Sequence, residues 1–263
     1  MKQEKRFLVD VGIQDLYYPI LVNSRNEPDG QHTIANISIE ARIMSGFEAR
    51  WIDKFIHILH DHKGRIGTAS LRQNILDYLK DLSASYVHIT FAYPFFVEKE
   101  APVSGEKNLV KYDCRYSVTA TASAQEPEGQ FNIQVPVITT YPAASSETPA
   151  GLFGQLSIVD LQLDTRELIN PEDMVELVDR HALAPTYSYL SGEDQKHLIK
   201  QIHDREKYSV VMVDEIKREL ASREDIPGSS IRCYNHGMLH GFSTMISTEN
   251  SPWVPYSGYS DDY

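Results

Sequence analysis

Two histidines near the C-terminus have a spacing that suits side-chain chemistry. His236 and His240 stand four residues apart in a segment that we expect to be a strand, so both side chains would face the same side. Imidazole transfers protons near neutral pH and is a common metal ligand. Two interpretations stay open: a metal site completed by another histidine, or a hydrogen-bonding pair at an interface.

Other candidate groups have simpler interpretations. His57, His60 and His62 do not share one face of the helix that we expect there, which indicates a solvated helix face. A serine nucleophile at Ser145 would need a sharp supporting turn, but no G-x-S-x-G motif surrounds it, so the segment 145–148 is predicted to be a polar loop.

The two cysteines, Cys114 and Cys233, lie in apolar, strand-like segments and form no C-x-x-C pair. This excludes a thiol-based zinc knuckle and predicts two buried free thiols in a reducing compartment.

Charge and hydropathy restrict the partners. The 263 residues include 25 basic and 37 acidic side chains, a net charge of -12, which argues against a nucleic-acid partner. The N-terminal residues lack an apolar stretch of signal-peptide length, and no window approaches a membrane span. We therefore expect a cytoplasmic protein with no membrane partner.

The elements that must position these residues follow from hydrophobic periodicity. Alternation with period two predicts strands, and apolar residues three and four apart predict helices. Asn170 is the expected N-cap of the third helix, with Pro171 at its first position. The expected order is strands at 16–24 and 33–43, helices at 48–62 and 69–82, strands at 87–93, 112–118, 131–137 and 157–163, helices after 170 and at 207–222, and strands at 229–235 and 238–247 before a tail at 248–263.

This order predicts an α+β protein built from two ββααββ units. A polar stretch between Ala122 and Gly129 marks the boundary, so we expect units at 1–124 and 125–263.

Several segments resemble the type IB GTP cyclohydrolases, over roughly residues 8–247. They are Val11-Gly12-Ile13 with Tyr18-Pro19, Gln31-His32-Thr33, Ser83-Ala84-Ser85 leading into 93–99, Met212-Val213-Asp214, and Cys233-Tyr234-Asn235 leading to Leu239-His240. The resemblance implies the tunnelling fold (T-fold), with antiparallel sheets and helices on one face. It also implies a small-molecule substrate and a homodimer or homotetramer with sites at subunit interfaces.

The segments that carry the family's chemistry depart from its pattern. The family's "C-P-C-S-K" segment reads Tyr141-Pro142-Ala143-Ala144-Ser145 here, and "A-H-N-Q-R" reads 152–156. By this correspondence a metal-binding cysteine becomes Tyr141, a histidine becomes Phe153 and a glutamate becomes Lys200. A substrate-anchoring glutamate becomes Gly237, and only His240 is kept.

These replacements remove the ligands of a zinc ion, which typically needs three side chains from the protein. Phenylalanine cannot bind a metal, and a lysine ammonium repels one. We therefore expect no metal and no cofactor. The repurposed site would use Tyr141 as proton donor, His240 as general acid or base and Lys200 as electrostatic stabiliser or Schiff-base amine.

Around this group, His236, Phe153, Gln155 and Ser145 are the candidate substrate-binding residues, and His197 and His203 fall near Lys200. The alternative is that Tyr141 only fills the vacated volume and Lys200 is solvated.

Three functions remain in competition. The favoured one is a metal-independent enzyme that acts on a small heterocyclic or biosynthetic intermediate and is not a standard GTP cyclohydrolase. The alternatives are a non-catalytic small-molecule-binding pseudoenzyme and a GTP cyclohydrolase-type hydrolase with a rebuilt metal site.

Overall fold

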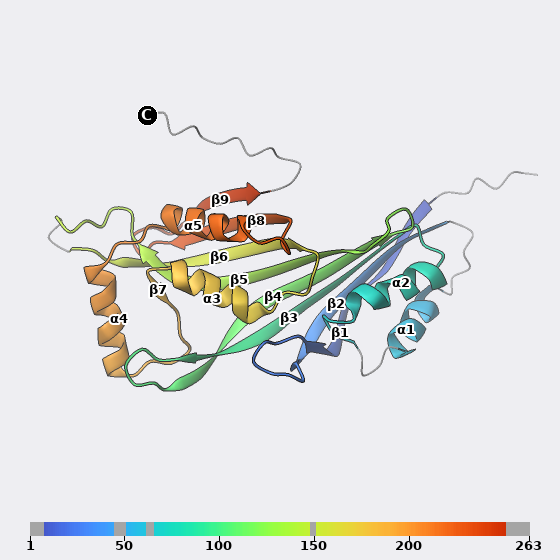
Figure 1. Ribbon diagram of the computed structural model, residues 1–263, viewed down its shortest axis with the longest axis horizontal. Helices are drawn as coiled ribbons and strands as arrows, with labels where there is room; N and C mark the ends of the chain where they lie inside the picture. Colours follow the sequence, from blue (N-terminus) through green and yellow to red (C-terminus); the bar gives the residue numbers. More distant parts are fainter. Residues whose placement is uncertain (1–7, 45–50, 62–65, 148–150, 251–263) are drawn as a thin grey trace, which may run out of the picture. The chain divides into compact units, whose positions relative to one another are not determined.

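A computed structural model of the protein describes residues 8–44, 51–61, 66–147 and 151–250. Along the chain, two strands and two helices are followed by four strands, then by three helices with a short strand among them, and finally by two strands (Figure 1). The elements are β1 (Leu8–Val22), β2 (Gln31–Met44), α1 (Trp51–Asp61), α2 (Leu71–Asp81), β3 (Tyr86–Glu100), β4 (Lys107–Thr121), β5 (Glu128–Thr140), β6 (Gly154–Thr165), α3 (Pro171–His181), β7 (Ala184–Pro185), α4 (Gly192–Asp204), α5 (Ser209–Ala221), β8 (Gly228–His236) and β9 (Thr244–Asn250).

The strands form a sheet in the order β1-β2-β3-β4-β5-β6-β8-β9, and β7 pairs with β5. Strand pairing is antiparallel in β1–β2, β2–β3, β5–β7, β6–β8 and β8–β9. A mostly antiparallel sheet with a few separate helices confirms the predicted α+β class. The helices of the described residues are too short or too polar to cross a membrane.

Contacts divide the chain into two compact units. Unit 1 comprises 1–95, 113–131 and 166–171, and unit 2 comprises 96–112, 132–165 and 172–263. Each of these units is a compact set of contacts made by several segments of the chain. The predicted division into tandem repeats at 1–124 and 125–263 concerns the order of elements along the chain instead, and it stays a prediction.

Unit 1 is built as its sequence pattern predicts. Ile37 and Ile39 of β2 alternate with exposed residues and are buried, and α1 and α2 turn Phe55, Leu59 and Ile75 into the same core. Helices are expected over 48–62 and 69–82 and are found over 51–61 and 71–81; residues 45–50 and 62–65 lie outside the described residues. Apolar side chains of both helices meet those of β2 and β3 on one face of the sheet.

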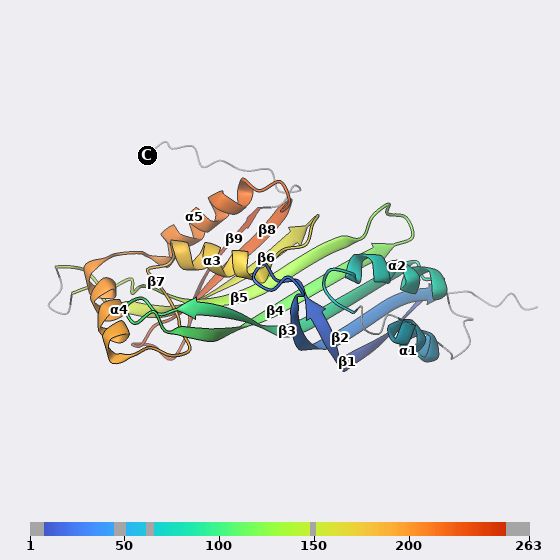
Figure 2. The same cartoon turned by 60° about the horizontal axis from the view of Figure 1, so that its bottom comes forward.

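Unit 2 places α3 and α5 along one face of β5, β6 and β8 (Figure 2). Val178 of α3 and Ile216 of α5 are fully buried, as are Val137 and Leu161 on the strands beneath. Two elements of this unit were not expected. The short strand β7 and the helix α4 lie between α3 and α5, where the sequence analysis predicted no regular structure.

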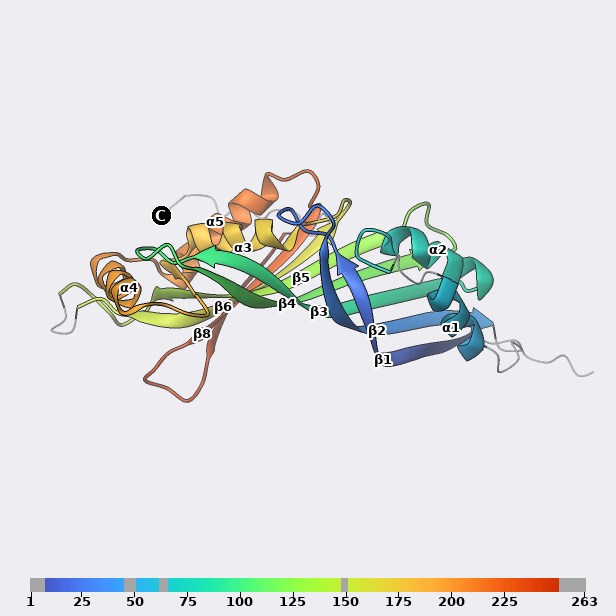
Figure 3. The same cartoon turned by 90° about the horizontal axis from the view of Figure 1, so that it is seen from below.

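The last hairpin is shifted relative to the prediction. Strand β8 matches the expected 229–235, but β9 covers 244–250 rather than 238–247. Residues 237–243 instead form the connection between β8 and β9, which Figure 3 shows as a loop extending away from the strands. This segment contains Gly237 and Gly241. Glycine within a strand-like pattern indicates a break in the strand, which the alternation of apolar residues alone does not show. Residues 251–263 of the predicted tail lie outside the described residues.

Candidate functional site

Polar side chains, all of them buried except Thr244, form a hydrogen-bonded chain across one end of the unit 2 sheet, which we call the polar ladder. Gln155 Nε2 donates to Thr139 Oγ1 at 3.3 Å, and the hydroxyls of Thr139 and Ser157 are 2.7 Å apart. Ser157 Oγ donates to Asn235 Oδ1 at 2.7 Å, and Asn235 Nδ2 donates to Thr244 Oγ1 at 3.4 Å. Buried polar groups are stable when they are paired in this way. The ladder gives this end of the sheet a polar interior.

An aromatic pair covers the end of β5 next to the ladder. The rings of Tyr141 and Phe153 stack with centroids 5.0 Å apart and an interplanar angle of 19°, and Tyr141 N–H donates to Phe153 O at 2.9 Å. Tyr141 is only 7% exposed and packs with Leu152 and Ala144. Its ring therefore belongs to a small apolar cluster.

Tyr141 also occupies the space in front of Gly237. A Cβ atom added at Gly237 would lie 2.7 Å from Tyr141 Cε2, closer than such contacts occur. A side chain at position 237 and the present Tyr141 ring therefore exclude one another. Two separate departures from the family pattern, Tyr141 and Gly237, therefore lie next to one another.

The three predicted catalytic residues lie at separate places in unit 2. Tyr141 is buried after β5, Lys200 is exposed on α4, and His240 is exposed in the β8–β9 connection, where it stacks on Phe242 at 4.8 Å. Within the described part of the chain, no hydrogen bond or ion pair joins any two of the three. Their catalytic roles stay predictions.

The predicted substrate-binding residues are mostly engaged within the protein. Gln155 is buried, and its amide donates a hydrogen bond to Thr139. Ser145 Oγ accepts a hydrogen bond from Glu147 N–H at 3.2 Å, which is typical of a polar loop. Phe153 is half-buried against Tyr141, and His236 is exposed at the end of β8. Their contact with a substrate also stays a prediction.

Asp194 fixes the start of α4 and was not recognised as a site residue. It is fully buried, and its carboxylate accepts from Val103 N–H and Ser104 N–H at 2.9 Å each and from Ser104 Oγ at 2.8 Å. Ser191 Oγ donates to it at 2.5 Å and accepts from its N–H in a capping box. The hydrogen bond from Ser191 and those from residues 103 and 104 hold the pKa of Asp194 well below its usual value. The Ser191-x-x-Asp194 spacing was the available signal for this helix start.

The far end of α4 reaches the segment that carries Phe153. His203 Nδ1 is hydrogen-bonded to Leu152 O, and a Cβ added at Gly154 would lie 3.1 Å from Ile202 Cγ2. Gln201 Nε2 donates to Leu183 O at 2.7 Å. The helix α4 therefore connects the β3–β4 hairpin to the segment preceding β6.

A buried ion pair lies between β3 and α3. Lys99 is 9% exposed and its Nζ lies 2.5 Å from Asp179 Oδ2, between the rings of Tyr112 and Tyr187. Burial lowers the pKa of Lys99 and raises that of Asp179, while the attraction between them opposes both shifts. Among the described atoms, Asp179 Oδ1 and Tyr112 Oη have no hydrogen-bond partner.

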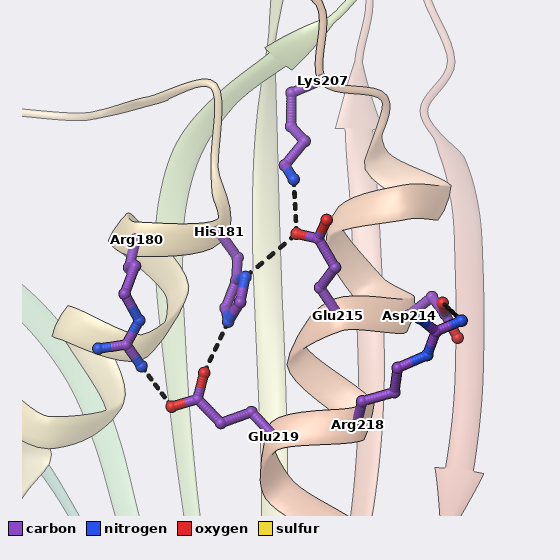
Figure 4. A network of polar contacts seen from close by, with 7 residues as sticks. All are labelled: Arg180, His181, Lys207, Asp214, Glu215, Arg218 and Glu219. Atoms are coloured by element: carbon purple, nitrogen blue, oxygen red, sulfur yellow. Dashed lines mark hydrogen bonds and ion pairs between the residues drawn. The ribbon is translucent and has the colours of Figure 1, made fainter.

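A charge network joins α3 to α5 (Figure 4). The two ring nitrogens of His181 lie 3.1 Å from Glu215 Oε2 and 2.8 Å from Glu219 Oε2. Lys207 Nζ is 2.5 Å from the same Glu215 oxygen and lowers the pKa of Glu215, and Arg180 pairs with Glu219. The network therefore joins the end of α3 to α5.

The two cysteines are free and buried, as predicted. Burial raises the pKa of Cys233 to about 11, so this thiol is a poor nucleophile.

Possible metal ligands do not cluster in the described residues. Across 8–44, 51–61, 66–147 and 151–250, no group of three or more His, Cys, Asp or Glu side chains is placed to hold a metal ion. His236 and His240 are both exposed and lack a third ligand of these types within that part of the chain.

Comparisons with known proteins point to the same family, and the matches cover nearly the whole chain. The model of the family described as "Type I GTP cyclohydrolase folE2" matches residues 2–245. The protein named GTP cyclohydrolase FolE2 from Pelobacter propionicus is 30% identical over 240 residues, covering 91% of each chain. The protein of the same name from Citrifermentans bemidjiense is 30% identical over 241 residues, 92% of this chain and 89% of its own.

Solved structures with a similar fold are urate oxidases. The enzyme from Bacillus sp. TB-90 superposes with a TM-score of 0.51 at 11% identity, covering 93% of this chain and 99% of its own. Uricase from Arthrobacter globiformis gives 0.51 at 10% identity, with 98% and 96% covered. At this identity the likeness concerns the fold alone, and it confirms the predicted tunnelling fold.

Proposed function

The chain belongs to the type I GTP cyclohydrolase FolE2 family, and from this membership we propose that it catalyses the ring-opening hydrolysis of GTP. Within the family we propose the type IB group, with this chain as a divergent member. The observation that carries the proposal is the family match over residues 2–245, together with relatives named GTP cyclohydrolase FolE2 that align over about nine-tenths of their own length.

The expected function is therefore corrected. A metal-independent enzyme that is not a standard GTP cyclohydrolase was favoured, on the ground that the family's ligand residues are replaced. The relatives support a genuine GTP cyclohydrolase, which overturns that expectation and the non-catalytic alternative. Four replaced side chains are therefore weaker evidence about function than the similarity of the whole chain.

Hydrolysis of both bonds from C8 of the purine to its ring nitrogens consumes two water molecules, releases this carbon as formate and leaves each former ring nitrogen as an amine. Proton transfer to the departing nitrogens is the step that a side chain must serve. We propose His240, which lies four residues after His236 in the sequence, for this proton transfer, and Lys200 for stabilising the negative charge of the bound substrate. Tyr141 is better suited to a packing role, because its ring is buried against Phe153 and Gly237.

The family resemblance also implies zinc, and the described residues do not fit it. Tyr141 stands in an apolar cluster where a thiolate ligand is expected, and Lys200 places a cation where a carboxylate is expected. We therefore derive no step of the reaction through a metal ion.

We propose a homodimer or homotetramer in the cytoplasm, with the site completed between subunits. The β8–β9 connection supports this, because it carries His240 and directly follows His236, and it has three exposed apolar side chains, Met238, Leu239 and Phe242. Exposed apolar residues that gather in this way commonly mark an interaction surface. Sedimentation velocity of the purified chain measures the assembly directly.

The test is formate release from GTP by the purified protein, measured after chelator treatment and again with added zinc or manganese. Time-dependent, stoichiometric formate that falls about 100-fold or more in H240A supports the proposal, by analogy with loss of a general acid or base. H60A, which removes an exposed histidine from α1, is the matched control and should keep full activity. Absence of formate under every metal condition, from a folded protein, would reject the proposal.

A further inference from the structure

One face of α4 carries a row of basic side chains, Lys196, Lys200 and His203, which we call the α4 row. Their spacing of four and three residues places them on the same side of the helix, with Lys196 and Lys200 about 6 Å apart along its axis. All three are exposed. The row therefore presents its positive charge to solvent.

The lysines of this row are free of ion pairs within the described part of the chain, although the protein has 37 acidic residues and a net charge of -12. The helix itself carries Glu193 and Asp204, yet neither makes an ion pair with Lys196 or Lys200. By contrast, Lys99 and Lys207 bind carboxylates at 2.5 Å. The ammonium groups of Lys196 and Lys200 are therefore available to bind another partner.

The helix that carries the row is held rigidly at both ends. Asp194 anchors its first turn to Val103 and Ser104, and His203 contacts Leu152 at its last turn. Leu152 precedes Phe153, which stacks on Tyr141. The row therefore ends beside the segment that covers the polar ladder.

A phosphate chain is the ligand chemistry that this row fits. Lysine ammonium groups bind phosphate oxygens as point charges through charge-assisted hydrogen bonds. We propose that Lys196 and Lys200, flanked by His203, form the binding site for the phosphate tail of a nucleoside triphosphate. This inference rests on the proposed function, in which GTP supplies that tail, and it assigns Lys200 to substrate binding.

The experiment compares wild type with the double variant K196Q/K200Q. Glutamine keeps the helix propensity and removes the charge. The matched control is K80Q/K111Q, which removes two exposed lysines from α2 and β4. We expect K196Q/K200Q to raise KM for GTP about 10-fold or more, the effect of losing one charged hydrogen bond, with kcat nearly unchanged. We expect the control to match wild type.

Inorganic triphosphate separates the phosphate tail from the base. It should bind wild type and compete with GTP, and its affinity should fall in K196Q/K200Q by the same factor as that for GTP. Binding of guanosine, which lacks phosphates, should be equal in the two proteins. A change in KM of less than twofold in K196Q/K200Q, or an equal change in K80Q/K111Q, would overturn the inference.

Failure of the proposed function gives a different result. Wild type would then release no formate from GTP, whereas calorimetric titration with inorganic triphosphate would still report on the row. Loss of that binding in K196Q/K200Q alone would support the phosphate site without GTP hydrolysis. Equal or absent binding in both proteins would overturn the inference as well.

Discussion

Tyr141 and Gly237 show how two residues far apart in sequence share one volume. The tyrosine ring lies where a side chain at position 237 would begin. Replacing only one member of such a pair leaves either a clash or a cavity, so we expect the effects of substitutions at the two positions to depend on each other.

We expect G237A to destabilise the protein by about 1–3 kcal/mol, because its Cβ overpacks against the Tyr141 ring. In the Y141A background the same substitution should cost much less, since the obstructing ring is gone. Urea unfolding of the two single variants and the double variant gives the coupling energy. Additive effects would show that the two side chains do not compete for space.

Asp194 gives a pH prediction whose sign is fixed by the direction of its pKa. Its carboxylate is stabilised in the folded protein, so its contribution to stability is complete above its usual pKa of 3.8 and is lost as the pH falls below that value. We expect D194N to unfold at a clearly lower urea concentration than wild type at pH 6. The difference between the two proteins should shrink below about pH 4.

The control is D29N, an exposed aspartate in the β1–β2 turn. It should follow the wild-type curve at every pH. A gap between D194N and wild type that stays constant from pH 6 to pH 3.5 would mean that the carboxylate charge is not what holds the β3–β4 hairpin to α4.

At the scale of elements, the network around His181 is the main polar link between α3 and α5. We expect H181A to reduce the free energy of unfolding by about 1 kcal/mol, because the side chain is partly buried and both ring nitrogens face carboxylates. H57A removes the exposed pair with Asp61 on α1 and should change stability little. Equal effects of the two substitutions in thermal unfolding would contradict a special role for His181.

The elements themselves were largely predictable, for a physical reason. Strands such as β2 and β6 bury one face, and the resulting alternation is visible in sequence. The helix α4 was missed because its apolar stripe is short; Asp194 and Leu198 are its only buried residues. Its start was nevertheless encoded by Ser191 and Asp194, a capping signal that periodicity alone does not use.

The site was less predictable than the fold. Gln155 and Tyr141 are among the predicted site residues, and both lie at the same end of the sheet. The sequence does not indicate that the Tyr141 ring fills the space next to Gly237, or that Asp194 binds a hairpin ninety residues away. Such contacts depend on how strands and loops meet in space, which local patterns do not record.

At the scale of the whole molecule, net charge and local charge oppose each other. The chain carries -12 overall and should repel a nucleotide, whereas the α4 row should attract it. Salt screens both effects, so raising ionic strength should increase KM for GTP in wild type, where contact with the row dominates.

In K196Q/K200Q only the general repulsion remains, so the same increase in salt should lower KM. Steady-state kinetics from about 20 to 300 mM salt, a range over which screening changes strongly, measures both slopes. Slopes of the same sign in the two proteins would contradict this division of charge.

The polar ladder of unit 2 has a direction as well as a position. Gln155 donates to Thr139, and Ser157 donates to Asn235, so the hydroxyl hydrogen of Thr139 is left to point toward Ser157. Asn235 then donates onward to Thr244. The hydrogen bonds therefore follow one another from Gln155 of β6 to Thr139 of β5, back to Ser157 of β6, and on to Asn235 of β8 and Thr244 of β9.

Reversing that orientation would require both amides to rotate together, and sliding one strand by a residue would turn its ladder members to the opposite face. Unit 2 therefore has a set of side-chain hydrogen bonds that depends on its strand register, in addition to the burial of apolar side chains.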